Sequence, residues 1–193
     1  PSETDERMMV RLVALALHAH ELQDTCNGDG TLAFGAGLSD PDDPDASLTD
    51  FTGRKRLWIE VGQPEDKPIS KACSKADAVV LYAFNHAAEV WWKGIETKLT
   101  RLDKLQVWRI PSEAALELAQ LAQRSMQLQA TLQEGAITTS STQGSVHVPP
   151  LRRKSVLTPP PRWRPPPRCP PPAPGAPSAL GPCPPRRPRP RRA

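Results

Sequence analysis

Two strand-like apolar runs separated by a helical pattern constrain the fold of this chain more than any other feature. Leu57–Val61 and Ala78–Phe84 are apolar almost throughout, as in strands that a sheet buries on both faces. Between them, apolar residues recur at helical spacing from Ile69 to Ala76, and Pro68 suits the first turn of a helix. Strand, helix and strand in this order predict two parallel strands joined by a right-handed crossover.

Other periodic segments extend this unit into a larger α/β domain. Helical patterns predict helices over residues 2–17, with Ser2 as the N-cap, over 87–98 and over 111–123. Strand patterns predict strands over 31–34, 105–110 and 126–133, with 137–148 as a hairpin partner of the last. The expected fold class is therefore α/β, with strands and helices alternating along the chain.

The chain divides by composition at about residue 148. From Pro150 to Ala193 lie 17 of the 24 prolines, 11 of the 25 Lys and Arg residues and no acidic residue. The part before Pro150 therefore carries 14 basic residues against 21 acids, a net charge of −7. The basic character of the whole chain belongs to its end and says nothing about the expected folded part.

We expect residues 1–148 to form the domain and 149–193 to form an extended, disordered tail, because a Pro- and Arg-rich segment lacks the aliphatic residues of a core. Two explanations of the tail stay open. Its arginines suit nonspecific binding to nucleic acid through phosphate neutralisation. Pro, Arg, Ala and Gly also have G- and C-rich codons, so a frameshift in a GC-rich gene would produce the same composition, and we favour this second explanation.

The cysteines and the hydropathy pattern place the protein in the cytoplasm. The four cysteines contain no C-x-x-C pair, which argues against a structural zinc site, and their contexts are typical of reduced thiols. The sequence shows no signal peptide and no apolar span long enough for a membrane helix.

A candidate active site combines two acids and a lysine. Asp45 ends an acidic loop that begins at Ser39, and Glu60 stands near the carboxyl end of a predicted buried strand, where open α/β sheets place their ligands. Lys71 lies on the following helix in a row with Lys67 and Lys75. Two carboxylates can hold Mg²⁺, which polarises a phosphate and activates water, while a nearby cation stabilises the developing charge.

Each of these features also has an ordinary explanation. Clustered acids are common in exposed loops, and a row of lysines is common on a solvated helix face. His18 and His20 diverge on a helix, so they are more typical of partners for a helix end than of metal ligands. Charged residues on the first helix, including Arg7 and Arg11, suit local ion pairs, and the tryptophans suit a core.

Six segments, taken in order, resemble the YaeQ family of bacterial proteins. They are 1–9, 37–45, 58–64, 71–73, 90–92 and 124–129. The resemblance runs from Pro1 to about Val148 and implies a fold like that of the PD-(D/E)XK nucleases, which is a mixed sheet flanked by helices with the active-site acids at one edge of the sheet.

The resemblance also assigns expected roles. Pro44–Asp45 corresponds to the "PD" of the nuclease motif, and Glu60 to its second acid, so that both acids would bind Mg²⁺. Gly62 stands where the motif has its lysine. This departure points to Lys71 as a displaced catalytic cation, by analogy with relatives that carry the lysine on the next helix. Gln63 would orient the reactants, and Glu3 or Glu6 would add a carboxylate.

The family pattern further implies about 30 residues before Pro1 that supply sheet strands, so their loss would expose a sheet edge. The leading functional hypothesis is Mg²⁺-dependent binding or cleavage of nucleic acid, with Asp45, Glu60, Gln63 and Lys71 as the site. The alternative is a non-catalytic protein that keeps the fold and binds a protein partner through its acidic surface, for example in transcription.

Overall fold

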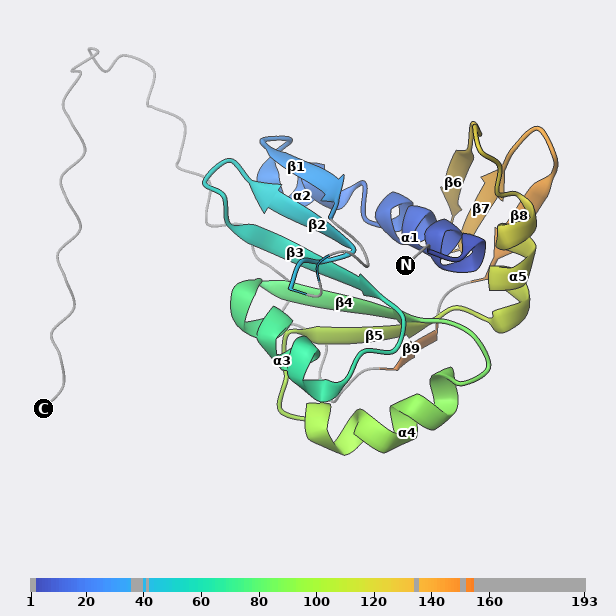
Figure 1. Cartoon of the computed structure of the whole chain (residues 1–193). Coiled ribbons are helices and arrows are strands. Elements are labelled where there is room, and N and C mark those ends of the chain that lie inside the picture. The colour runs from blue at the N-terminus through green and yellow to red at the C-terminus, as the bar shows by residue number, and fades with distance from the viewer. Residues whose placement is uncertain (1–2, 36–39, 41, 134–135, 150–151, 155–193) are drawn as a thin grey trace, which may run out of the picture. The chain divides into compact units, whose positions relative to one another are not determined.

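A mixed sheet forms the centre of the folded part of this chain, with its six strands in the order β1-β2-β3-β4-β5-β9 (Figure 1). The strands β3, β4 and β5 run parallel, β1 and β2 continue the sheet antiparallel to β3, and β9 pairs antiparallel with β5. Their bounds are β1 Gly30–Phe34, β2 Ala46–Asp50, β3 Lys55–Val61, β4 Ala78–Ala83, β5 Leu105–Arg109 and β9 Arg152–Lys154.

The computed structural model describes residues 3–35, 40, 42–133, 136–149 and 152–154. All of these belong to one of two units, which spans residues 1–160. In this described part of the chain, no helix is both long enough and apolar enough to cross a membrane. Of the tail expected to be disordered, 149–193, residues 152–154 form the strand β9 of the main sheet, and 155–193 lie outside the described residues.

Helices cover both faces of the sheet. The helices α3 (Asp66–Lys75) and α4 (Ala88–Leu99) connect the parallel strands and lie together on one face, as Figure 1 shows. The helices α1 (Asp5–Leu17) and α5 (Ser112–Gln120) pack against each other on the opposite face. A short helix, α2 (Glu21–Cys26), lies beside β1. This arrangement confirms the predicted mixed α/β fold with flanking helices.

The alternation of side chains along β4 shows why its sequence is apolar throughout. Val79 and Leu81 point into the core beneath α3 and α4, whereas Val80 and Tyr82 point into the core beneath α1 and α5. A strand buried on both faces has no solvated side, so polar residues are excluded from it. The same reasoning applies to residues 57–61 of β3, in which Glu60 is the exception, whereas Lys55 and Arg56 at the start of the strand are half-buried.

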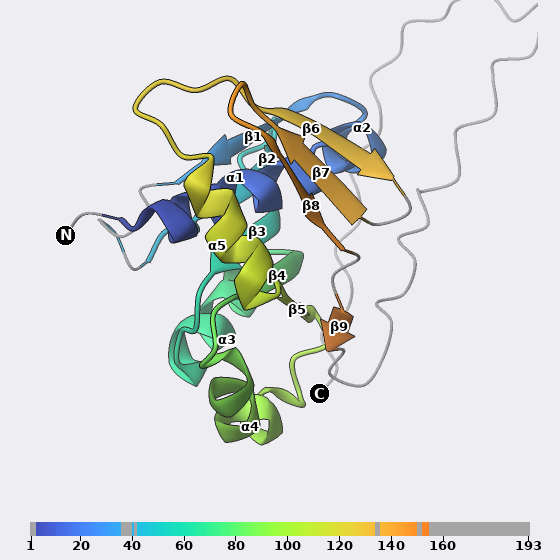
Figure 2. The same ribbon diagram turned by 90° about the vertical axis from the view of Figure 1, so that its right-hand side faces the viewer.

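A second sheet of three antiparallel strands packs next to α1 and α5 (Figure 2). It consists of β6 (Gln129–Gln133), β7 (Ala136–Ser140) and β8 (Ser145–Val148). Ile137, Val146 and Val148 are buried in the core that α1 and α5 share with the main sheet. The small sheet therefore extends one of the two cores.

Apart from α2 and β9, neither of which was predicted, the structure differs from the sequence predictions at four places. The first helix has Thr4 as its N-cap, while Ser2 lies outside the described residues. No strand was predicted at β2. All five residues of β6 are exposed, although alternation predicted a half-buried strand. The segment 137–148 forms two strands instead of one, because a turn in which the Ser141 amide donates to the Gly144 carbonyl divides it.

Candidate active site

Asp45 lies directly before β2, and its carboxylate is held by an arginine from α1. Its side chain is only 2% exposed. The Nη2 of Arg7 donates to both carboxylate oxygens, at 2.7 and 2.9 Å, and the amide of Val61 donates to Oδ2 at 2.7 Å. Arg11 donates to the main-chain carbonyl of Asp45 at 3.1 Å. Both carboxylate oxygens of Asp45, the predicted first acid of the motif, therefore accept hydrogen bonds from within the protein.

The helix α1 places its charged residues in one row facing this loop. Glu3, Arg7 and Arg11 are four residues apart, so they share one face of the helix. Glu3 pairs with Arg11 at 2.7 Å and lies 3.6 Å from Arg7. Burial raises the pKa of the Asp45 carboxyl, while the Val61 amide and the two guanidinium groups act in the opposite direction. Two cations and two carboxylates thus form a cluster with balanced charge.

Glu60 lies beside Asp45 in the sheet, in a different environment. Ala46 pairs with Ile59, which brings the residue before β2 close to Glu60 on β3. The indole Nε1 of Trp58 donates to Glu60 Oε2 at 3.1 Å. Burial, and to a lesser degree the charge of Asp45, raises the pKa of Glu60 from 4.5 to about 7. Glu60 is therefore close to half-protonated at neutral pH.

A small cavity adjoins Glu60 beneath α3. It has a volume of about 20 Å³, which suffices for about one water molecule. Its lining is apolar apart from Glu60 and consists of Trp58, Pro64, Pro68, Ile69, Ala72, Val79 and Leu81. This apolar lining is the physical reason for the raised pKa of Glu60, because a carboxylate loses its hydration there.

Gln63 and Gly62 follow β3 and have structural roles. The side-chain amide of Gln63 donates to the carbonyl of Phe84 at 2.6 Å and to Oδ1 of Asn85 at 2.8 Å, which ties the loop after β3 to the end of β4. Gly62 has a φ of 125°, a conformation that other residues rarely adopt. The backbone thus explains why a glycine stands at the position of the motif lysine.

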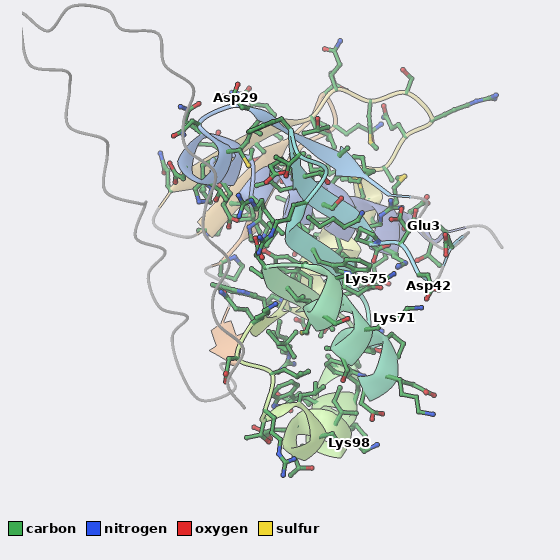
Figure 3. All side chains as sticks on the ribbon, turned by 90° about the vertical axis from the view of Figure 1, so that its left-hand side faces the viewer. Glu3, Asp29, Asp42, Lys71, Lys75 and Lys98 are labelled. Carbon is green, nitrogen blue, oxygen red and sulfur yellow. The ribbon has the colours of Figure 1, made fainter. Side chains whose placement is uncertain are left out.

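Lys71, the predicted catalytic cation, is bound to the acidic loop. Its Nζ lies 2.5 Å from Oδ1 of Asp42, and Lys75 donates to the main-chain carbonyl of Asp42 at 3.1 Å. Figure 3 shows both lysines on α3 beside Asp42. Lys55 pairs with Asp43 at 3.3 Å. Lysines of α3 and β3 thus pair with Asp42 and Asp43, two acids of this loop.

The remaining histidine candidates are not part of this site. His18 contacts Glu21 at 2.7 Å through Nδ1 and the hydroxyl of Tyr82 at 2.8 Å through Nε2. His20 is exposed at the start of α2. Both contacts of the His18 ring are to side chains, and the His20 side chain makes no capping hydrogen bond to α2, so a role of either histidine as partner for a helix end stays a prediction.

The donor set around Asp45 does not suit a magnesium ion as it is folded. Mg²⁺ requires oxygen ligands in a nearly octahedral arrangement. Both oxygens of Asp45 already accept hydrogen bonds, and the adjacent guanidinium groups would repel an added cation. Among the residues that the structure describes, no group of three His, Cys, Asp or Glu side chains could hold a metal ion. The magnesium site and the four catalytic roles stay predictions.

Arg7 and Arg11 are the site residues that sequence reasoning missed. They form the expected local pairs with Glu3, and in addition they reach Asp45 across more than thirty residues of chain. A signal was present, since Glu3, Arg7 and Arg11 form a charged row at i, i+4 and i+8 next to an apolar stripe. Such a row indicates a helix face that contacts other charges, but it does not identify them.

Comparison with known proteins identifies the family of this chain. The family model described as "YaeQ protein" matches residues 1–150. The chain belongs to the YaeQ family. Two relatives named "Uncharacterized protein YaeQ" are similar over 149 residues, which is 77% of this chain and 77% of each relative. The identity is 39% for the protein from Salmonella typhi and 38% for that from Escherichia coli K12.

Two crystal structures of YaeQ proteins share the fold. The structure from Xanthomonas axonopodis pv. citri has a TM-score of 0.70 and 37% identity, covering 80% of this chain and 82% of that one. The structure from Pseudomonas syringae has a TM-score of 0.70 and 29% identity, covering 80% of both chains. The family assignment from the sequence is thereby confirmed.

Proposed function

We propose that this YaeQ family protein is non-catalytic, and that it keeps a nuclease-like fold while binding a protein partner. The observation that carries the proposal is the pairing of Lys71 with Asp42. A nuclease of this type needs a cation directed at the reacting phosphate. Here the lysine in the nominated position is neutralised by the acidic loop, and Lys75 is held by the same loop.

The charge of the domain supports a protein partner over nucleic acid. Residues 1–149 carry a net charge of −7, which repels a phosphate backbone. The same charge attracts a partner with a basic surface and accelerates its association. Cross-linking of the full chain in cells is expected to join a partner protein to residues 1–149.

The decisive test is hydrolysis. The full chain and its Glu60→Ala variant are incubated with single- and double-stranded DNA and RNA in the presence of Mg²⁺ or Mn²⁺. We expect no cleavage by the intact chain beyond that of the variant. Metal-dependent cleavage that disappears in Glu60→Ala would overturn the proposal.

A metal-dependent nuclease of the PD-(D/E)XK type is the second candidate, and Glu60 favours it. A carboxyl whose pKa is raised to about 7 in an apolar cavity is typical of catalytic acids and bases. The mixed sheet with flanking helices also agrees with the fold class that the resemblance implies. The hydrolysis assay separates the two candidates directly.

A further inference from the structure

We infer that Arg7, assisted by Arg11, occupies the position that a divalent cation takes between paired acids, so the folded chain binds no Mg²⁺ or Mn²⁺ through Asp45. This inference concerns the cation at the site and goes beyond the proposed function, because a protein can lack catalysis and still bind metal.

The geometry of Arg7 resembles that of a chelated cation. One nitrogen, Nη2, lies 2.7 Å from one oxygen of Asp45 and 2.9 Å from the other, so a single positive group bridges the carboxylate. The other nitrogen, Nη1, donates to the carbonyl of Val61 at 3.0 Å. Because the amide of Val61 also donates to Asp45, the arginine and the carboxylate are both fixed to the end of β3.

The negative charge of Asp45 is already compensated, so a metal ion is not needed to balance it. Arg7 and Arg11 balance the charges of Glu3 and Asp45. The side chains of the two arginines are 15% and 12% exposed, so their charges are poorly screened by water. A divalent ion at Asp45 would meet two resident positive charges at short range in a medium of low polarity.

The hydrogen bonding of the cluster is incomplete, although its charges are balanced. Within the described part of the chain, Glu3 Oε1, Arg7 Nε and Arg11 Nε are buried and lack a hydrogen-bond partner. A fully bonded network would satisfy these atoms. Removing the guanidinium of Arg7 should therefore release the carboxylates of Glu3 and Asp45 for another cation.

The test follows the electron paramagnetic resonance signal of free Mn²⁺ during titration with the full chain. Wild type is expected to leave the signal of free Mn²⁺ unchanged, whereas Arg7→Gln should lower it by binding about one ion per chain. Adding Asp45→Asn to Arg7→Gln should abolish that binding. Arg54→Gln is the matched control, because Arg54 pairs with Asp77 instead of Asp45.

Two results would overturn the inference. One is binding of Mn²⁺ by wild type that Asp45→Asn removes. The other is an Arg7→Gln variant that is folded by circular dichroism but does not bind Mn²⁺. If Arg7→Gln does not fold, the wild-type titration decides alone. Since the readout is free Mn²⁺, its outcome is independent of the hydrolysis assay that tests the proposed function.

Discussion

Asp45 and Glu60 are neighbouring buried carboxyl groups that have different partners. Asp45 has two guanidinium partners and a main-chain amide, so its charge is compensated. Glu60 has one indole donor, which favours its charged form, but its burial beside an apolar cavity outweighs that hydrogen bond and disfavours the charge. A carboxyl kept where it costs stability is more typical of a functional group than of a structural one.

Glu60→Gln should make the stability of the protein less dependent on pH. Between pH 4.5 and about 7 the folded state retains a proton that the unfolded chain has lost, so the free energy of unfolding of wild type falls as the pH rises. The loss is complete above pH 7. Glutamine cannot ionise but can still accept the Trp58 hydrogen bond, so the variant should be more stable than wild type at pH 8, by about 1–3 kcal/mol.

Urea unfolding of both proteins at pH 5 and pH 8 measures this effect, and the advantage of the variant should nearly vanish at pH 5. Glu117→Gln, on the exposed face of α5, is the matched control and should show no such difference. An equal effect of Glu60→Gln at both pH values would contradict the raised pKa.

Gly62→Ala should destabilise the protein, because the φ of 125° at this position strains any side chain. The expected cost is about 1–3 kcal/mol in the free energy of unfolding. Gly94→Ala is the matched control: Gly94 lies inside α4 with open space around it, so the same change should stabilise by about 0.5–1 kcal/mol.

Gly62→Lys would restore the lysine of the nuclease motif in sequence. The same strain applies to it, so the variant should be destabilised like Gly62→Ala and should not gain cleavage activity. Denaturant unfolding and the hydrolysis assay measure the two effects. A stable Gly62→Lys variant would show that the loop tolerates the lysine.

At the scale of secondary-structure elements, the candidate site depends on the acidic loop before β2, which is bound by helices from both faces of the sheet. The segment before β2 is bound by Arg7 and Arg11 from α1 and by Lys71 and Lys75 from α3. The end of β1 fixes it further, since the amide of Gly35 donates to the carbonyl of Asp45. Two helices on opposite faces of the sheet thereby determine where one acidic loop lies.

Gly35→Ala should disturb this loop. A Cβ at Gly35 would lie 1.9 Å from the carbonyl oxygen of Pro44, so the backbone would have to move. We expect a loss of about 1–3 kcal/mol in the free energy of unfolding, measured by thermal or urea unfolding. Gly144→Ala should change stability much less, because its nearest neighbour, a Leu121 methyl, lies at an ordinary contact distance of 3.9 Å. Equal stability of the two variants would contradict the close approach.

At the scale of the whole fold, Asp45 and Glu60 meet where the pairing of neighbouring strands changes from antiparallel to parallel. β3 pairs antiparallel with β2 on one side and parallel with β4 on the other. The beginning of β2 therefore lies beside the carboxyl end of β3, which has the carboxyl end of β4 on its other side. This topology brings Asp45, Glu60 and the Gln63 loop together, although they belong to separate segments.

The sequence alone determined the parallel unit β3-α3-β4 and its continuation through α4, β5 and α5, because residue periodicity is a local property of the chain. It also determined the family, since six matching segments are specific. It did not reveal β2, whose sequence Ala-Ser-Leu-Thr-Asp is short and weakly apolar, and which forms a strand by pairing with β1 and β3.

Only the tertiary structure decided the charge partners of the candidate site. The sequence identified Asp45, Glu60 and Lys71 as groups that could meet, but it could not show that Arg7 binds Asp45 or that Lys71 binds Asp42. Ion pairs between distant segments depend on which helix face packs against which loop, and this follows from burial of the apolar stripes. The charges then pair with the groups that packing places beside them.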